Sequence, residues 1–269
     1  MNKRLLIVGV VLIAVAFLGV MIVLSQKSPE AAKVLSVSVQ QLYDEAVALE
    51  NKNELLAAKE AYQKILAEHP DFKDIAQLQK RLEGVNLKII ISAVETPKTV
   101  THEVRVGDSL GKIAKQYNTT VELIKKSNGL AGDIIKVGQR LRIWQGTFSV
   151  FVDKSQNILI LKSDDEVVKV YPVATGKNNI TPVGTFKIVD KLVNPVWFKS
   201  GAIVPPDSPE NILGSRWLGF DIPGYGIHGT TDPASIGQQI TAGCVRMHNE
   251  DVEELYSLLP VGTQVTIVD

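Results

Sequence analysis

An uncharged run of twenty residues, Leu5 to Leu24, sets the first limit on the fold, because so long an apolar stretch is typical of a membrane-spanning helix. Twenty helical residues rise about 30 Å, the thickness of a bilayer's hydrocarbon core. Lys3 and Arg4 precede the run and favour a cytoplasmic start, so the rest of the chain is expected outside the cytoplasm. The run is long for a signal peptide and ends without small cleavage-site residues. We therefore predict an uncleaved anchor over residues 1–28, with a cleaved signal peptide as the alternative.

The composition excludes several classes of protein. The 269 residues contain 29 Lys and Arg and 29 Asp and Glu, so no net charge attracts the chain to polyanions, and we expect no nucleic-acid partner. The length allows one or two ordinary domains, or several small ones. The single cysteine, Cys244, excludes an intrachain disulfide. A lone thiol is either a small buried apolar group or a reactive one.

Residues 36–93 are predicted to form a small helical segment. Apolar residues recur at helical spacing on both sides of a break at Asn51–Asn53. Ala58, Tyr62 and Pro70 resemble the second helix and exit of one tetratricopeptide repeat. Stacked repeats need about three units to be stable, so a spacer or self-association element is expected, and any protein partner stays unknown. Residues 94–100 are predicted to be a linker.

Residues 101–145 show a βααβ pattern. An alternating stretch at His102–Val106 predicts a strand, and Asp108 or Ser109 is placed to cap the helix that follows. Asn128-Gly129 is a typical stop for the second helix, and Arg140–Ile143 predicts the returning strand.

This module closely resembles the LysM family. The matching positions are Val104, Gly107-Asp108-Ser109-Leu110, Ile113-Ala114, Tyr117, Asn128, Gly138-Gln139 and Leu141. The resemblance implies a module that binds glycans containing N-acetylglucosamine, such as peptidoglycan. It implies glycan contacts at Gly107, Asp108, Ser109, Leu110 and Asn128.

From Phe148 onward, short apolar or alternating runs separated by turns predict strands. The only amphipathic helix expected there covers Glu250–Leu259. A β-rich sandwich or barrel-like domain is therefore predicted over 146–269. The whole chain is predicted to be multidomain α+β, with a transmembrane helix, a small helical hairpin segment, a βααβ LysM module and a β-rich catalytic domain.

His228 and Cys244 are the candidates for chemistry. A thiol attacks as the thiolate, and histidine is the base that titrates in the required range. Flanking glycines would let a substrate approach, and the N–H groups of Gly243 and Cys244 could face an oxyanion. Arg246 is a fixed cation that could hold a substrate carboxylate or brace the site. On spacing alone, a structural role for the cysteine is equally open.

A zinc site is a further alternative. Its ligands would be His228, Cys244 and His248, with Asp232 or water as the fourth. The paired spacings of ordinary zinc sites are missing, so we expect no metal and no cofactor.

Residues 150–268 resemble the YkuD-type L,D-transpeptidase catalytic domain. The matching motifs are Val152–Gln156, Tyr171–Gly176, Thr181–Phe186, Leu213–Gly219, His228-Gly229-Thr230 and Gly243–Met247. The resemblance implies that Cys244 is the nucleophile, His228 its base and Gly229 the carbonyl that orients the imidazole. It further implies oxyanion donors at Gly243 and Cys244, the family arginine at Arg246, and substrate contacts at Tyr225 and Thr230. Ala242 departs from the histidine that many relatives carry there.

The resemblance implies an enzyme that joins peptidoglycan stem peptides by 3→3 crosslinks through a cysteine thioester. Water in place of the acceptor amine would give an L,D-carboxypeptidase, and a non-catalytic wall-binding scaffold is the other alternative. With the predicted anchor, the implied location is the bacterial cell envelope, with the catalytic domain outside the cytoplasmic membrane.

Overall fold

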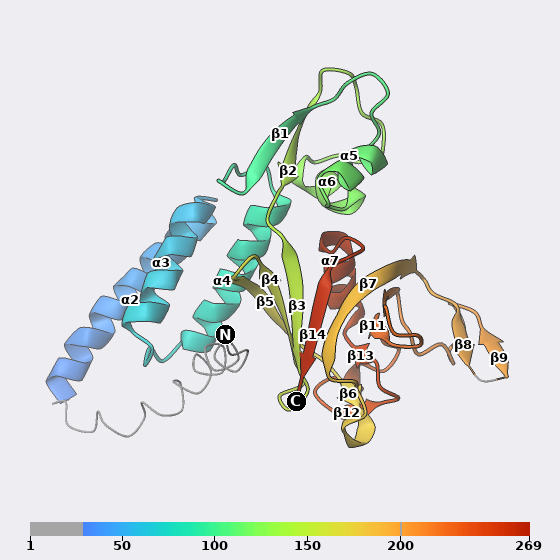
Figure 1. The fold of residues 1–269 in the computed structure, drawn as a ribbon. Helices are drawn as coiled ribbons and strands as arrows, with labels where there is room; N and C mark the ends of the chain where they lie inside the picture. The colour runs from blue at the N-terminus through green and yellow to red at the C-terminus, as the bar shows by residue number, and fades with distance from the viewer. Residues whose placement is uncertain (1–28, 200) are drawn as a thin grey trace, which may run out of the picture. The chain divides into compact units, whose positions relative to one another are not determined.

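The computed structural model describes residues 29–199 and 201–269. The described residues form two compact units, which divide between Val85 and Asn86 (Figure 1). In the two described ranges, no helix has the length and apolar character needed to cross a bilayer. The predicted anchor, residues 1–28, lies outside the described residues.

The first unit is helical. It contains α2 (Pro29–Asn51), α3 (Leu55–Glu68) and the start of α4 (Ile75–Ile91). Helix α2 begins seven residues before the predicted segment. It ends at the expected break, where Asn53 has a left-handed φ of 61°. Asparagine tolerates this conformation better than most residues, which explains why the chain turns there.

A polar contact links the three helices of the first unit. The fully buried Tyr62 donates from its hydroxyl to Glu50 Oε2 at 2.9 Å, and Arg81 Nη1 donates to the same oxygen at 2.8 Å. Burial, together with the hydrogen bond to Glu50, raises the pKa of Tyr62 above its usual range. This arrangement describes a small helical bundle with its own core.

The LysM module has the predicted βααβ order. Its elements are β1 (Thr99–Glu103), α5 (Leu110–Gln116), α6 (Val121–Ser127) and β2 (Arg140–Trp144). The predicted linker, 94–100, extends two residues too far, because Thr99 and Val100 pair with Trp144 and Ile143 in the β1–β2 ladder. That pairing is non-local, so the local composition of the segment did not reveal it.

Arg142 joins the end of α4 to the LysM module. Its buried guanidinium donates to the carbonyl oxygens of Ile90 at 2.8 Å, Ile89 at 2.9 Å and Val94 at 2.7 Å. The last carbonyls of a helix have no partner within it, so this arginine satisfies them. The end of α4 therefore belongs to the second unit.

The remainder of the second unit is the β-rich domain. Its elements are β3 (Phe148–Asp153), β4 (Ile158–Ser163), β5 (Glu166–Pro172), β6 (Thr175–Gly176), a 3₁₀ turn η2 (Lys177–Asn179), β7 (Gly184–Val193), β8 (Trp197–Lys199), β9 (Ala202–Val204), β10 (Arg216–Phe220), β11 (Gly226–His228), a 3₁₀ turn η3 (Pro233–Ser235), β12 (Gln239–Thr241), β13 (Val245–Arg246), α7 (Asn249–Leu258) and β14 (Gln264–Val268).

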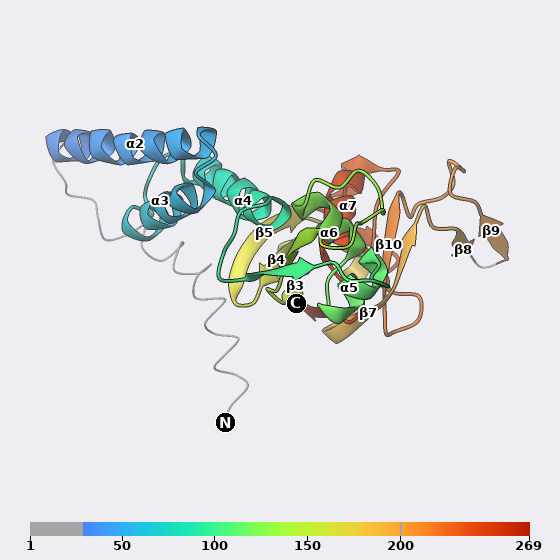
Figure 2. The same ribbon diagram turned by 90° about the horizontal axis from the view of Figure 1, so that it is seen from above.

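Eight of these strands follow one continuous order, β13-β11-β10-β7-β14-β3-β4-β5. The long strand β7 pairs with β14 over Gly184–Lys187 and with β10 over Ile188–Val193, so it connects the two halves of the sheet. Two-stranded pairs, β6 with β12 and β8 with β9, lie outside this order. The β8–β9 hairpin projects away from the sheet (Figures 1 and 2).

Helix α7 forms within one residue of the predicted bounds and packs Val252, Leu255 and Leu258 into the core. Its far end meets the LysM helix α6, as both views show (Figures 1 and 2). There Thr120 donates from its hydroxyl to the carbonyl of Ser257, and Lys126 Nζ donates to Ser257 Oγ at 2.9 Å. One helix thus runs from the candidate site to the LysM module.

Candidate active site

Two neighbouring parallel strands bring the histidine and the cysteine together. In the β11–β13 pair, Ile227 lies opposite Val245 and His228 lies opposite Arg246. Ile227 and Val245 are fully buried, and strand side chains alternate between faces. The other face therefore carries His228 and Arg246. It also carries Cys244, which precedes β13 by one residue.

The His228 imidazole is buried and neutral. Its Nδ1 lies 2.7 Å from the carbonyl oxygen of Gly229, and the ring stacks on Trp217 with centroids 6.2 Å apart. Burial, helped by the charge on Arg246, lowers the pKa of His228 to about 4, while the carbonyls of Gly229 and Leu213 act in the opposite direction. The bond to Gly229 assigns the proton to Nδ1 and leaves Nε2 as the basic nitrogen.

The Cys244 thiol is half-buried and protonated at rest. Burial raises its pKa, although the N–H of Gly226 and the charge on Arg246 oppose that increase. Sγ donates to the carbonyl oxygen of Gly224 at 3.4 Å. The resting site therefore has a thiol that donates to a backbone carbonyl and a neutral imidazole on the neighbouring strand.

The guanidinium group of Arg246 has one nitrogen in a hydrogen bond and another, Nε, without a partner. Its Nη1 donates to Ser235 Oγ at 3.0 Å, while Nε is buried and has no hydrogen-bond partner among the described residues. A buried N–H without an acceptor is costly, so an incoming oxygen atom would be favoured there.

Gly243 has the backbone conformation that the cysteine loop needs. Its φ is +124°, and a Cβ at this position would lie 2.7 Å from the ring of Tyr225. This contact places Tyr225 directly against the loop. However, the Gly243 N–H donates to Thr241 Oγ1 at 3.2 Å, and that hydroxyl donates to the Cys244 carbonyl at 2.6 Å. In this structure the Gly243 N–H is therefore engaged within the loop, and its predicted oxyanion role stays a prediction.

Thr230 was expected to contact substrate, and the structure places it inside the protein. It is 2% exposed, and its hydroxyl accepts from the Asp232 N–H at 2.9 Å. Its own N–H and carbonyl are both bonded to the side chain of Asn249. Thr230 therefore shapes the loop after His228. The contacts of Asn249 could not be predicted from the sequence, because its partners are 19 and 34 residues away.

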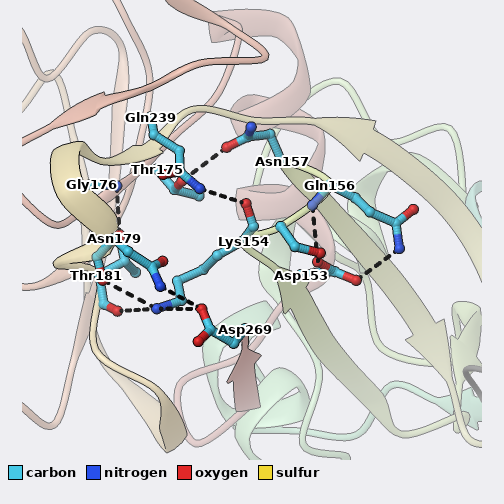
Figure 3. A network of polar contacts seen from close by, with 11 residues as sticks. Asp153, Lys154, Gln156, Asn157, Thr175, Gly176, Asn179, Thr181, Gln239 and Asp269 are labelled. Atoms are coloured by element: carbon cyan, nitrogen blue, oxygen red, sulfur yellow. Dashed lines mark hydrogen bonds and ion pairs between the residues drawn. The ribbon is translucent and has the colours of Figure 1, made fainter.

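The segment that leads into the cysteine loop is held by a polar network (Figure 3). Asn157 Nδ2 donates to the Gly237 carbonyl at 3.1 Å, and Gln239 Nε2 donates to the Lys154 carbonyl at 3.2 Å. Thr175 donates from its hydroxyl to Asn157 Oδ1 at 2.9 Å and pairs with Gln239 in the β6–β12 ladder. These contacts fix the chain four residues before Gly243.

Lys154 belongs to the same network. Its buried Nζ donates to the carbonyls of Thr181 at 3.0 Å and Asn179 at 3.3 Å and pairs with Asp269 Oδ1 at 3.3 Å (Figure 3). A buried ammonium group needs such partners to offset its lost hydration. Three of the motifs that carry the family resemblance, around residues 152–156, 171–176 and 181–186, thus support the cysteine loop.

The LysM residues predicted to contact glycan have several structural roles. Gly107 has a φ of +88° in the loop before α5, which favours glycine. Ser109 caps that helix by accepting from the Lys112 N–H at 3.3 Å. Asp108 instead accepts from the Arg105 N–H at 2.7 Å and faces His102 Nε2 at 3.1 Å, and these bonds lower its pKa.

Two of these residues, the buried Leu110 and the half-buried Asn128, make contacts within the module. Leu110 is 3% exposed within the LysM core. Asn128 Nδ2 donates to the carbonyls of Ile124 and Arg142, each at 2.8 Å, and its Oδ1 accepts from the Arg142 N–H at 2.7 Å. Both residues therefore build the module, and the exposed loop at Gly107 is left as the surface candidate.

The zinc alternative required three ligands to converge. Over residues 29–199 and 201–269, no group of three or more His, Cys, Asp or Glu side chains could hold a metal ion. His248 lies at the N-cap of α7, and the imidazole of His228 faces backbone carbonyls. The thiol and the imidazole thus remain as a pair suited to nucleophilic chemistry.

The fold and the site define a β-rich domain with a cysteine and a histidine on neighbouring strands. The family model of the L,D-transpeptidase catalytic domain, YkuD, matches residues 147–267, and the LysM domain model matches residues 102–144. A Bacillus subtilis (strain 168) protein named as an L,D-transpeptidase, YqjB, is 44% identical over 126 residues, which are 45% of this chain and 70% of YqjB.

A second relative matches a longer part of the chain. YkuD of Bacillus subtilis (strain 168), also named as an L,D-transpeptidase, is 34% identical over 175 residues, which are 62% of this chain and 98% of YkuD. An X-ray structure of an L,D-transpeptidase from Mycobacterium tuberculosis H37Rv covers 50% of this chain and 64% of its own, with a TM-score of 0.41 and 17% identity. The chain belongs to the YkuD family of L,D-transpeptidases and carries a LysM domain.

Buried neutral His228 should make the second unit sensitive to acid. Its pKa is about 4 when folded and 6.5 in its ordinary state, so the unfolded chain binds more protons between those values. The free energy of unfolding is therefore expected to fall by about 3 kcal/mol as the pH drops from 6.5 through 4. Urea unfolding followed by tryptophan fluorescence measures this, because all three tryptophans lie in residues 86–269. His228→Gln should flatten that pH dependence, and an unchanged slope would contradict the buried neutral state.

Proposed function

We propose that this protein is a peptidoglycan L,D-transpeptidase that forms 3→3 crosslinks through a thioester on Cys244. The observation that carries the proposal is the placement of Cys244, His228 and Arg246 on one face of two parallel strands. Family membership supports the reaction class, and the LysM domain supports a wall glycan as the attachment site.

In the first half-reaction, Cys244 Sγ attacks the carbonyl of the L-centred third residue of a stem tetrapeptide. His228 Nε2 takes the thiol proton during the attack, since both groups are neutral at rest. The new S–C bond forms, the C–N bond to D-alanine breaks, and His228 gives its proton to the leaving amine. We assign the Cys244 N–H to the developing oxyanion, because the Gly243 N–H is bonded to Thr241.

In the second half-reaction, a side-chain amine of a neighbouring stem attacks the thioester carbonyl. A C–N bond forms, the C–S bond breaks, and His228 transfers the amine proton back to sulfur. Arg246 offers its unpartnered Nε–H to an oxygen atom of the bound peptide. Tyr225, which packs on the cysteine loop, is placed to line the substrate site.

The LysM module would hold the enzyme on glycan strands and raise the local concentration of stems. Location at the bacterial cell envelope follows from these wall substrates. The uncharged run at the start of the chain would add a membrane anchor to this arrangement. L,D-carboxypeptidase action shares the first half-reaction, so the acceptor decides between the two activities.

Product analysis tests the proposal. The full chain is incubated with disaccharide-tetrapeptide, and the same chain alkylated with iodoacetamide serves as the blank. A dimer that has lost one D-alanine, seen by mass spectrometry only with the unblocked protein, is the expected result. Tripeptide alone would show carboxypeptidase action instead. No product from either sample, with an acceptor stem present, would contradict an enzymatic role and favour the scaffold alternative.

A further inference from the structure

The carboxamide of Asn249, the first residue of α7, links two loops that surround His228. Its Oδ1 accepts from the Thr230 N–H at 3.0 Å and from the Ser215 N–H at 3.1 Å, and its Nδ2 donates to the Thr230 carbonyl at 2.8 Å. Thr230 follows the residue whose carbonyl holds the imidazole. Asn249 itself comes five residues after Cys244, so it connects the nucleophile segment to the loops around the base.

The bonds form a continuous chain through one peptide unit. The Gly229 carbonyl, which accepts from His228 Nδ1 at 2.7 Å, and the Thr230 N–H belong to the same peptide group. An N–H that donates to Asn249 polarises that peptide and makes its carbonyl a better acceptor. The Asn249 carboxamide therefore acts on the Gly229–Thr230 peptide group, and that peptide group acts on the His228 imidazole.

Asn249 also holds the loop Leu213–Ser215, which contacts the imidazole. The Ser215 N–H held by Asn249 lies two residues after Leu213, whose carbonyl also acts on the imidazole. Asn249 thus fixes both of the segments whose carbonyls face His228.

Two glycines leave the space that this carboxamide occupies. A Cβ on Gly229 would lie 2.1 Å from Asn249 Oδ1, and a Cβ on Gly214 would lie 2.2 Å from the same atom. Gly214 also has a φ of +64°, which other residues rarely adopt. Any larger residue at Gly229 or Gly214 would therefore collide with Asn249 Oδ1.

We propose that Asn249 is a positioning residue for the reaction: it fixes the Gly229–Thr230 peptide so that its carbonyl holds the His228 imidazole with the proton on Nδ1. The role resembles that of the third member of a catalytic triad, exerted through a peptide group instead of a carboxylate. The inference rests on the proposed function, because it assumes that His228 is the base.

The test compares Asn249→Ala and Asn249→Asp with the wild-type full chain. The rate of acylation by a carbapenem is measured from pH 3 to 8, and ¹⁵N NMR reports the tautomer of His228. Asn249→Ala is expected to lower the acylation rate about tenfold at pH 7, the effect of losing a hydrogen bond that orders the base. It should also reduce the population of the Nδ1-protonated tautomer.

Asn249→Asp keeps an oxygen acceptor for both N–H groups but loses the donor to the Thr230 carbonyl, so it should restore part of the rate. Its negative charge should move the acid limb of the rate profile to higher pH, against the opposing charge of Arg246. The charged groups that act on Arg246 in turn are Asp232 and Cys244. Asn86→Ala is the matched control, because Asn86 also bonds backbone carbonyls, at Val167 and Val168, and lies outside the site. It should leave the rate, the pH profile and the tautomer unchanged.

A wild-type rate and tautomer in Asn249→Ala would overturn the proposal. So would a loss in Asn249→Ala that Asn249→Asp does not restore while the tautomer stays unchanged, since that pattern belongs to a purely structural residue. If the wild-type chain itself is not acylated, the proposed function fails, while the NMR comparison still decides whether Asn249 sets the His228 tautomer.

Discussion

Cys244→Ala is expected to abolish acylation by carbapenems and all turnover of tetrapeptide stems, a loss of at least about 10⁴-fold. The chain holds no second cysteine that could replace it. Intact-protein mass spectrometry measures acylation, and product analysis measures turnover. The substitution removes one half-buried sulfur atom, so the far-ultraviolet circular dichroism and the melting transition should stay close to those of the wild type.

Binding to peptidoglycan provides the control for this variant. Sedimentation with purified peptidoglycan should be the same for Cys244→Ala and the wild-type chain, because the LysM module is a separate part of the second unit. Residual turnover in Cys244→Ala would mean that another group forms the acyl-enzyme, and the assignment of the nucleophile would then be wrong.

His228→Ala is expected to lower the rate of acylation at pH 7 by roughly 10²- to 10⁴-fold, the usual contribution of a positioned general base. The remaining reaction should speed up with pH, about tenfold per unit until the thiol ionises. The reason is that burial raises the pKa of Cys244, so without the imidazole only hydroxide can remove its proton. Stopped-flow acylation kinetics between pH 6 and 10 measures both effects.

His248→Ala is the matched control for His228→Ala. It removes a second histidine from the segment next to the site, at the N-cap of α7, where its side chain makes no capping bond. Its acylation rate should stay within about twofold of the wild type. If His228→Ala kept the wild-type rate and pH profile, the thiol would have to ionise without this base.

The local parts of the fold could be predicted from the sequence. Helix periodicity and cap residues act over three or four positions, and Ser109 and Thr120 cap α5 and α6 by accepting from the N–H three residues later. The end of the linker at Thr99 could not be predicted, because it depends on pairing with Trp144. The same holds for β7, which pairs with one strand in each half of its length.

The proposed reactive pair could be picked out from the sequence because the proposed chemistry depends on residue type. A lone cysteine and a histidine among glycines suggested a nucleophile and a base, and the family resemblance assigned them. The contacts of Asn249 could not be predicted, because nothing near this residue in the sequence indicates that it bonds to Thr230 and Ser215. The burial of Thr230 was likewise hidden, since a threonine after a catalytic strand can face either substrate or core.

The central claim is that turnover passes through a thioester on Cys244. The most direct measurement is intact-protein mass spectrometry of the full chain, quenched in acid during reaction with disaccharide-tetrapeptide. The account predicts an adduct with the mass of the donor minus D-alanine, mapped to the peptide that contains Cys244 and removed by hydroxylamine. Product formation with no adduct on Cys244, or with an adduct on a different residue, would contradict it.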